Sequence, residues 1–258
     1  MTNSLMTNSL ITNSSFLIWS SASVSDAGKI RKVNQDAYLD LPELGLWVVA
    51  DGMGGHEAGE VASGAIIENC QQTSEPGDLN SFISDVQNRL LQANQSLRKI
   101  AIQQYKNATI GSTVVALLAY GKQCACLWVG DSRIYRLRKT KLEQMTRDHS
   151  IVEQYIEQGI MSVEEAQHSN VTNALTRAVG GEDEMEIDLK IDEIQSDDIF
   201  LLCSDGLYRE VSEADITQLM SRGDDCSTMT KNLLESALKN GARDNVTVSV
   251  VQIKDAFA

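Results

Sequence analysis

The chain has little positive charge. Its 258 residues include 22 Lys and Arg against 36 Asp and Glu, which gives a formal net charge of −14 at pH 7. Nucleic acids and anionic membrane surfaces attract clustered basic side chains, so this balance argues against both as partners. Metal ions, small molecules and proteins with basic surfaces are the partners that such a chain favours.

Long apolar runs are also missing. No stretch of 18 consecutive apolar residues occurs, so no transmembrane helix is expected. The N-terminus lacks the basic segment followed by an apolar one that is typical of a secretory signal. We therefore expect a cytoplasmic protein without a membrane partner.

Cysteine is sparse and odd in number. The 5 cysteines in a chain of this length do not indicate a disulfide scaffold. Cys124 and Cys126 would share one face of a strand, where two small buried residues are a simpler interpretation than a metal site. A composition with 42% hydrophobic residues and only 2 Pro fits a globular domain with a sizeable core.

The N-terminal segment repeats a polar pentapeptide. The three copies are Met1-Thr-Asn-Ser-Leu5, Met6-Thr-Asn-Ser-Leu10 and Ile11-Thr-Asn-Ser-Ser15. Such a segment cannot bury a core, so residues 1–15 are predicted to form a flexible tail. The remaining residues, 16–258, are predicted to form a single domain that acts as a monomer.

Residue patterns predict both strands and helices in that domain. Apolar or alternating runs predict strands, whereas apolar residues three or four apart predict helices. The predicted strands are Phe16–Val24, Leu46–Ala50, Thr113–Ala119, Ala125–Val129, Ile134–Leu137, Ile199–Cys203 and Val246–Ile253; the predicted helices are 56–72, 79–105, one capped by Ser212, and 226–239. This order predicts a layered α+β fold in which sheet packs on sheet and the helices lie outside.

A polar segment, residues 147–183, interrupts the strand pattern. It contains a short helical stretch, Ile151–Gln158, a second helix start at Ser162-Val-Glu-Glu165, and a glycine pair at its end. Loops of this length inside a compact domain are usually functional. We predict that it forms a flap beside the functional site.

Four short acidic stretches carry the functional signal. They are Asn34-Gln35-Asp36, Asp51-Gly52-Met53-Gly54-Gly55, Ser204-Asp205-Gly206 and Arg243-Asp244-Asn245. Each places an aspartate at the end of an apolar run or at the start of a turn. Asp-Gly is also a common turn dipeptide, so one stretch alone indicates little. Four together suggest one metal centre.

Carboxylate ligands without neighbouring His or Cys select Mg²⁺, Mn²⁺ or Ca²⁺ over Zn²⁺. Asp51 is the best candidate to bridge two ions, and the backbone carbonyl of Gly52 could join it as a ligand. Two ions about 4 Å apart would activate a water molecule for attack on a phosphoryl group. Arg31 supplies the planar donor fork that a phosphate needs in such an acidic site.

The ordered motifs resemble one protein family. They are Gly28-Lys-Ile-Arg31-x-x-Asn34-Gln35-Asp36, Val48-Val-Ala-Asp51-Gly-Met-Gly-Gly-His56, Gly111-Ser-Thr113, Val129-Gly-Asp131-Ser-Arg133, Leu202-Cys-Ser-Asp205-Gly-Leu207 and Ala242-Arg-Asp244-Asn-Val-Thr247. Together they resemble the bacterial PP2C-type (PPM) protein serine/threonine phosphatases from about residue 17 to residue 253. Each motif is weak alone, but the ordered set is specific.

The resemblance implies a fold and an activity. The fold would be a four-layer α-β-β-α sandwich, with two central antiparallel sheets flanked by helix pairs. The activity would be metal-dependent hydrolysis of phosphoserine and phosphothreonine in proteins at a binuclear Mg²⁺ or Mn²⁺ site. The partners would be phosphorylated proteins, among them a cognate Ser/Thr kinase or its targets.

The resemblance also assigns roles to single residues. The first metal would be held by Asp51, Asp205 and Asp244, and the second by Asp51 and the Gly52 carbonyl, with Asp36 beside it or on its water. Arg31 would bind the phosphate. Asp131, together with Asp205, matches a third and weaker metal position. Asn245 is expected to orient Asp244 by hydrogen bonding.

One departure from the family concerns the leaving group. Some relatives carry a His directly after Asp-Gly, and it is proposed to protonate the leaving alkoxide. Met53 stands at that position here, and His56 lies three residues further on. The acid could be His56, a metal-bound water or no group at all.

Other interpretations remain possible at this point. Cys203-Ser-Asp-Gly-Leu-Tyr-Arg209 fits the Cys-x5-Arg pattern of cysteine-dependent phosphatases, although an aspartate lies inside the loop. A regulatory binding module without turnover is a second alternative. A nuclease or nucleotide hydrolase is a third, disfavoured by the acidic charge and by the lack of a phosphate-binding Gly-x-x-x-x-Gly-Lys loop. Arg133 is expected to be a structural ion-pair partner, and His149 and His168 to be flap surface or N-cap residues.

Overall fold

Two antiparallel β-sheets form the centre of the protein. The structure is a computed structural model, and it describes residues 17–54, 58–104, 110–162, 165 and 174–256. One sheet contains, in spatial order, β1 (Leu17–Asp26), β11 (Val246–Asp255), β10 (Ile199–Cys203), β7 (Arg133–Arg138) and β8 (Lys141–Gln144). The other contains β2 (Asp36–Leu41), β3 (Leu46–Met53), β5 (Val114–Tyr120), β6 (Gln123–Val129) and β9 (Asp188–Glu193), while the short β4 (Gly111–Ser112) pairs with β3.

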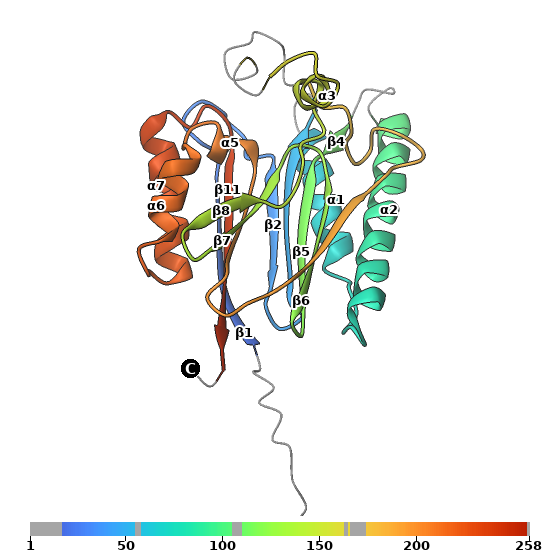
Figure 1. The fold of residues 1–258 in the computed structure, drawn as a ribbon. Helices are drawn as coiled ribbons and strands as arrows, with labels where there is room; N and C mark the ends of the chain where they lie inside the picture. Colours follow the sequence, from blue (N-terminus) through green and yellow to red (C-terminus); the bar gives the residue numbers. More distant parts are fainter. Residues whose placement is uncertain (1–16, 55–57, 105–109, 163–164, 166–173, 257–258) are drawn as a thin grey trace, which may run out of the picture.

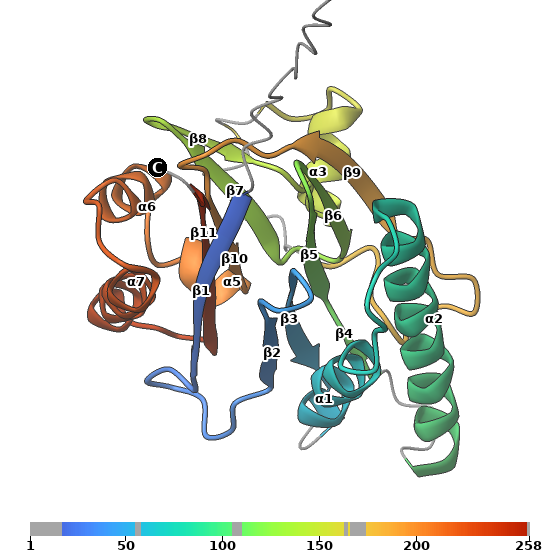
Figure 2. The ribbon, with the colours of Figure 1, turned by 90° about the horizontal axis from the view of Figure 1, so that it is seen from below.

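Helices cover the outer faces of both sheets (Figure 1). On one side lie α1 (Ala58–Cys70) and α2 (Leu79–Gln104), and on the other side lie α6 (Glu213–Met220) and α7 (Cys226–Asn240). Figure 2, seen along the strands, shows the helix pairs separated by the two sheets. The predicted α+β sandwich is therefore confirmed. No helix in the described part of the chain is long and apolar enough to cross a membrane.

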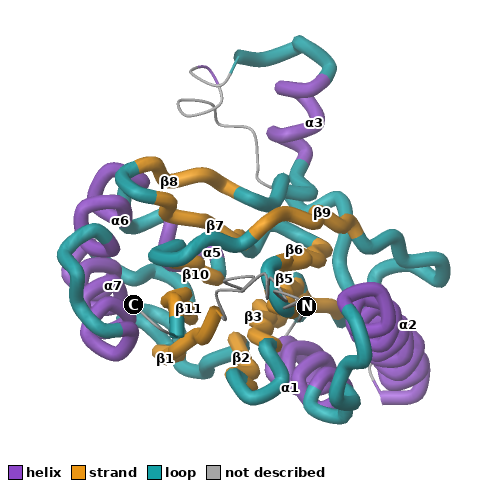
Figure 3. The backbone as a smooth tube through the Cα atoms, turned by 60° about the horizontal axis from the view of Figure 1, so that its bottom comes forward, coloured by secondary structure: helices purple, strands orange, loops and turns teal. Residues whose placement is uncertain are grey.

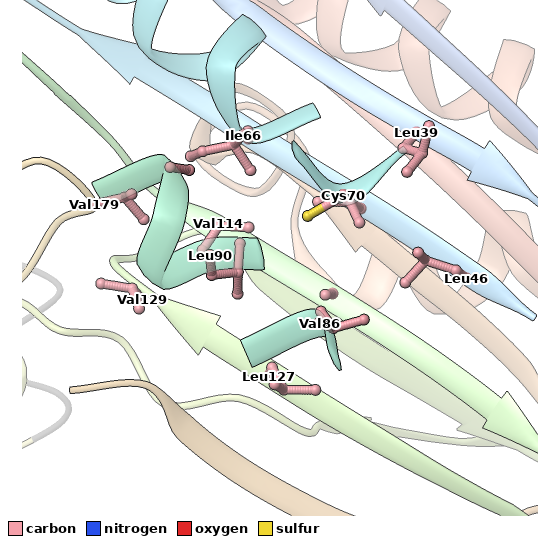
Figure 4. Packing of buried hydrophobic residues seen from close by; sticks show 14 of the residues in the cluster. Leu39, Leu46, Ile66, Cys70, Val86, Leu90, Val114, Leu127, Val129 and Val179 are labelled. Carbon is pink, nitrogen blue, oxygen red and sulfur yellow. The ribbon is translucent and has the colours of Figure 1, made fainter. Parts of the chain in front are cut away.

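Strand periodicity explains how the layers pack. Successive side chains of a strand point to opposite faces, so a strand buried on both sides is apolar throughout. In β3, Leu46 and Val48 belong to the cluster beneath α1 and α2, whereas Trp47 and Val49 belong to the cluster between the sheets. Figure 4 shows the first cluster, in which Leu90 and Val86 of α2 face the sheet residue Leu127.

The opposite sheet repeats this arrangement. In β10, Phe200 and Leu202 belong to the cluster between the sheets, while Leu201 and Cys203 pack in the cluster beneath α6 and α7. Three stacked apolar clusters thus separate the four layers. This explains why Ile199–Cys203 reads as a continuous apolar run rather than an alternating one.

Several boundaries and elements differ from the sequence-based expectation. The sequence patterns do not predict the strands β2, β4, β8 and β9 or the single-turn helix α5 (Asp205–Tyr208). The strands β8 and β9 are sheet edges rich in charged residues, a composition that protects an edge but hides it from apolar patterning. The helix start predicted at Ser212 is confirmed, because its hydroxyl accepts a hydrogen bond from the Asp215 N–H at 3.2 Å; the same hydroxyl donates to the Asp215 carboxylate at 2.7 Å.

The segment predicted as a flap is anchored at both ends. At its start Ser150 caps α3 (Ile151–Glu157) by accepting from the Glu153 N–H, and Ser150 also bridges to Leu175. At its end Val179 bridges to Ser112 of β4. In Figure 3, α3 stands away from the two sheets. The remaining flap residues, 163–164 and 166–173, lie outside the described residues, as do the predicted tail and His168.

Candidate active site

The motif aspartates converge at one end of the sandwich. Asp36 begins β2 and stands directly opposite Asp51 of β3 in the strand register. Asp205 is the first residue of α5, which follows β10, and Asp244 precedes Asn245 and the last strand, which begins at Val246. Residues that are far apart in the chain meet here because the ends of the strands next to them lie together at one end of the sandwich.

A cleft of about 260 Å³ opens at this point. Most residues predicted for the site line it, namely Arg31, Asp51, Gly52, Asp131, Asp205, Asp244 and Asn245, together with Gln35, Met53, Gly54, Thr113, Leu175 and Arg209. Leu175 shows that the flap forms part of its wall. His56 lies outside the described residues, so its role stays a prediction.

Asp36 lies behind the cleft, in a network of hydroxyl groups. Its Oδ2 accepts hydrogen bonds from the Ser204 and Thr247 hydroxyls, both at 2.7 Å. Its Oδ1 is buried and has no hydrogen-bond partner among the described residues. Burial raises the pKa of Asp36 to about 6, and the two hydroxyls oppose that rise. The network fixes one oxygen and leaves the other available to a ligand.

The backbone of Asp51 is fixed from the neighbouring strand. Its N–H donates to the Thr113 hydroxyl at 3.2 Å, and its carbonyl accepts from the Thr113 N–H and the Ser112 hydroxyl, both at 2.9 Å. Burial and the nearby carboxylates, Asp36 first among them, raise the pKa of Asp51 well above its usual value. A cation at this position would remove that electrostatic penalty.

Arg209 neutralises two carboxylates in the cleft. Its Nη2 lies 2.8 Å from Asp205 and 3.4 Å from Asp131. Burial and the Asp205 charge still raise the pKa of Asp131 to about 7. From the sequence, Arg209 is considered only as part of the Cys-x5-Arg pattern. Its position four residues after Asp205 could have indicated an ion pair between the two residues on one helical turn.

Arg31 is paired with one of the predicted metal ligands. Its Nη2 lies 2.8 Å from Asp244 Oδ2, and the Arg31 side chain remains 54% exposed. Arg31 also lines the cleft, and phosphate binding by its guanidinium stays a prediction. In this arrangement the Arg31 guanidinium is paired with Asp244, the carboxylate that is predicted to bind a metal ion.

The predicted hydrogen bond between Asn245 and Asp244 is present, but the side chain of Asn245 does not make it. The bond to Asp244 comes from the backbone N–H of Asn245 at 2.9 Å. Its side chain instead holds the loop that carries Arg31: the amide group donates to the Ala27 and Val33 carbonyls at 3.0 Å, and its oxygen accepts from the Gln35 N–H at 2.9 Å. Asn245 therefore positions the Arg31 loop relative to Asp244.

Two glycines let the motif loops approach one another. A Cβ at Gly52 would lie 1.9 Å from the Gly59 carbonyl oxygen of α1, so no larger residue fits. Gly28 has φ +73°, and a Cβ there would lie 2.2 Å from the Asp244 carbonyl oxygen. The sequence-based argument connected Gly52 to access by a metal ion; the structure shows that close backbone packing already requires glycine at this position.

The site chemistry fits hard divalent cations. Oδ1 atoms of Asp36 and Asp205 are buried without hydrogen-bond partners in the described part of the chain. Crowded carboxylates with raised pKa values favour a bound cation, and oxygen ligands favour Mg²⁺ or Mn²⁺. Yet no three His, Cys, Asp or Glu side chains of the described residues already form a closed ligand set. Arg31 and Arg209 pair with Asp244 and Asp205, so these guanidinium groups would compete with a metal ion for the carboxylates.

The cysteine-phosphatase interpretation is wrong. Cys203 is fully buried in β10, and burial raises the pKa of its thiol to about 12. The nucleophile in that chemistry is a thiolate, which this environment suppresses. Arg209, the other end of the pattern, is paired with Asp205 and Asp131.

Two further expectations have opposite outcomes. Arg133 is a structural ion-pair residue as predicted, with Nε at 3.0 Å and Nη2 at 2.8 Å from the Asp148 carboxylate. His149 is not a surface residue, because it is 8% exposed and its Nδ1 accepts from the Gly130 N–H at 3.1 Å. It packs against Trp128 with the rings stacked 6.3 Å apart.

Comparison with known proteins identifies the family to which this fold and these motifs belong. The family model of protein phosphatase 2C matches residues 29–244. The chain therefore belongs to the protein phosphatase 2C family and is a protein serine/threonine phosphatase by class.

Individual relatives support this membership. The serine/threonine phosphatase Stp of Listeria innocua is 31% identical over 235 residues, covering 88% of this chain and 93% of the relative. The structure of PppA, described as a regulatory component of the type VI secretion system in Pseudomonas aeruginosa, is 38% identical with a TM-score of 0.85 and coverage of 93% and 99%. The catalytic domain of PstP, solved with two manganese ions, is 32% identical with a TM-score of 0.83 and coverage of 93% and 100%.

Proposed function

We propose that the cleft binds two Mg²⁺ or Mn²⁺ ions and hydrolyses phosphoserine and phosphothreonine in proteins. The convergence of Asp36, Asp51, Asp205 and Asp244 beside Arg31 carries the proposal. The relative PstP, crystallised with two manganese ions, supports the metal count. When bound, such ions supply an activated water and neutralise the charge of the phosphoryl group.

Each residue has a defined part in this proposal. Asp51 holds both ions, Asp205 and Asp244 hold the first, and the Gly52 carbonyl holds the second. Asp36, fixed through Oδ2 by its two hydroxyl partners, presents Oδ1 to the second ion or to its water.

Arg31 binds the phosphate in this proposal. The exposure of its side chain keeps it accessible to substrate, and release from Asp244 frees its donor fork. The guanidinium thus neutralises Asp244 in the metal-free site and turns to the substrate in the loaded one.

A third, weaker ion belongs to the same proposal. Asp131 and Asp205 both contact Arg209, so their carboxylates lie close enough to share a cation in its place. We further propose that the enzyme opposes a Ser/Thr kinase, acts as a monomer and uses the flap to shape its substrate groove. A single catalytic domain of residues 16–258 and a cytoplasmic location stay predictions.

The test is hydrolysis of a phosphothreonine peptide with Mn²⁺, with EDTA, and in the variant Asp51→Asn. We expect Mn²⁺-dependent turnover, its loss in EDTA, and a fall of at least about 100-fold in kcat for the variant. Asp197→Asn is the matched control, because Asp197 is exposed with φ +68°, a conformation that Asn tolerates. Full activity of Asp51→Asn would contradict the proposed site.

A further inference from the structure

A second hollow opens beside the candidate active site. It measures about 370 Å³ and is lined by Arg31, Gly206, Arg209, Glu210, Arg243 and Asp244. We call it the arginine hollow. It shares Arg31, Arg209 and Asp244 with the cleft, so the two spaces have a common wall. A peptide whose phosphoresidue occupied the cleft would place a neighbouring residue in the hollow.

The charge of the arginine hollow contrasts with that of the chain. Three arginines line it against two carboxylates, in a protein with a formal net charge of −14. One of the carboxylates, Asp244, is a proposed metal ligand. With its charge taken up by an ion, three guanidinium groups would face Glu210 alone. The hollow is then a local positive site that attracts anionic groups.

Arg243 differs from the other two arginines of the hollow, because it does not neutralise a carboxylate of the proposed metal site. Arg31 and Arg209 pair with aspartates of the cleft, but Arg243 pairs with Glu210, its Nε lying 2.9 Å from Oε1. The Glu210 side chain is 6% exposed and Arg243 is 77% exposed. A buried carboxylate therefore fixes the guanidinium at Nε and leaves both terminal nitrogens able to donate.

We propose that the arginine hollow is a second anion subsite, which binds an acidic side chain or a second phosphate next to the phosphoresidue of the substrate. The proposal rests on the phosphatase function proposed for the cleft. Guanidinium groups bind carboxylates and phosphates through paired N–H donors. The enzyme would accordingly prefer acidic or doubly phosphorylated segments over neutral or basic ones.

The test uses phosphothreonine peptides that differ only in the residues on both sides of the phosphothreonine. These are alanine, aspartate, a second phosphothreonine, or lysine. With the Mn²⁺-loaded full chain, we expect kcat/KM for an anionic peptide to exceed that for the alanine peptide about tenfold. A larger ratio for the second phosphothreonine assigns the hollow to phosphate, and a larger ratio for aspartate assigns it to carboxylate.

Arg243 variants then locate the preference. Arg243→Gln should lower the anionic-to-alanine ratio to about one, and Arg243→Glu should favour the lysine peptide instead. Because each ratio compares two peptides with the same variant, a general change in the activity of that variant does not affect it. Arg243→Lys keeps the charge and should keep part of the preference. Arg222→Gln is the matched control, since Arg222 is an exposed arginine in the turn between α6 and α7, outside both cavities.

Three results would overturn the subsite while leaving the phosphatase intact. They are a wild-type ratio near one, a ratio unchanged in Arg243→Gln, and an equal fall in Arg222→Gln, which would indicate long-range charge rather than a site. Failure to hydrolyse any of the peptides would overturn the phosphatase proposal itself, and the subsite with it.

Discussion

Asp36 and Asp51 face each other as the first residue pair of the β2–β3 ladder. The Asp36 carboxylate makes Asp51 harder to ionise, because Asp36 is the first charged neighbour that raises the pKa of Asp51. Two hydroxyls hold Oδ2 of Asp36, from Ser204 beside Asp205 and from Thr247 after Asp244. The segments that carry the proposed metal ligands Asp205 and Asp244 thus also set the orientation of Asp36.

Removal of these hydroxyls should weaken metal binding as well as the fold. In the double variant Ser204→Ala, Thr247→Val, Asp36 loses both partners of Oδ2 and becomes free to rotate. Each lost hydrogen bond costs about 1 kcal/mol. We expect the Mn²⁺ concentration for half-maximal binding, measured by calorimetry, to rise about tenfold.

The control for this variant is Ser249→Ala on the same strand. Ser249 is fully buried and its hydroxyl accepts from Ser23 at 2.8 Å, without a bond to Asp36. It should lower stability by about 1 kcal/mol and leave Mn²⁺ affinity unchanged. Equal Mn²⁺ affinity in the double variant and the wild type would show that the hydroxyls do not position Asp36.

Arg209 should compete with metal ions for Asp205. Arg209→Gln removes the guanidinium that lies 2.8 Å from that carboxylate. The metal-free protein should become less stable to urea, because Asp205 and Asp131 lose their counter-charge, whereas calorimetric Mn²⁺ affinity should rise several-fold. Arg138→Gln is the control, since Arg138 pairs with buried Asp198 at 2.7 Å and with no aspartate of the cleft. Weaker Mn²⁺ binding in Arg209→Gln would instead make Arg209 a supporting residue of the loaded site.

The layered fold follows from the sequence because its central strands are apolar on both faces. Ile199–Cys203 was predicted with the boundaries that β10 has in the structure. The β2 strand is not predicted because it is short and begins and ends beside polar turns. Pairing with β3, and not its own residue pattern, fixes its strand conformation. Strand β9 alternates charged and apolar residues, and only Leu189 and Ile191 are apolar, too few to predict a strand.

The site was predictable only as far as its motifs. Asp51, Asp205 and Asp244 occur in recognisable stretches, and they meet in the cleft. The contacts between these stretches could not be predicted from the sequence. For example, the Asn245 side chain binds the backbone of Gln35 in the Arg31 loop, although the two residues are 210 positions apart. Ser204 and Thr247 lie beside motif aspartates, so they could have been proposed as supporting residues. Their orientation depends on strand register, which a single sequence does not state.

His149 should make the folded state sensitive to mild acid. Its burial lowers the pKa below the usual value, while the neighbouring Asp188 opposes that shift. The unfolded chain therefore binds this proton more readily than the folded one, so the contribution to stability is present above pH 6.5, the unfolded value, and falls as the pH decreases through it. His149→Asn keeps an acceptor for the Gly130 N–H and removes the titration.

The measurement is urea unfolding of both proteins at pH 8 and pH 5.5. We expect the stability of the wild type relative to His149→Asn to be smaller at pH 5.5 than at pH 8. A constant difference would show that His149 does not titrate differently in the folded state, and an increase at low pH would mean that Asp188 dominates over burial.

Close packing between the motif loops should make Gly52 intolerant of any side chain. In Gly52→Ala the new Cβ would lie 1.9 Å from the Gly59 carbonyl oxygen, and neither backbone can move without displacing Asp51 or α1. We expect a loss of about 3 kcal/mol or more in urea unfolding. Gly64 of α1 provides the comparison, because nothing lies within 4 Å of a Cβ there. Gly64→Ala should stabilise the protein by about 0.5–1 kcal/mol through helix propensity. A Gly52→Ala protein as stable as the wild type would contradict the interlocked arrangement of β3 and α1.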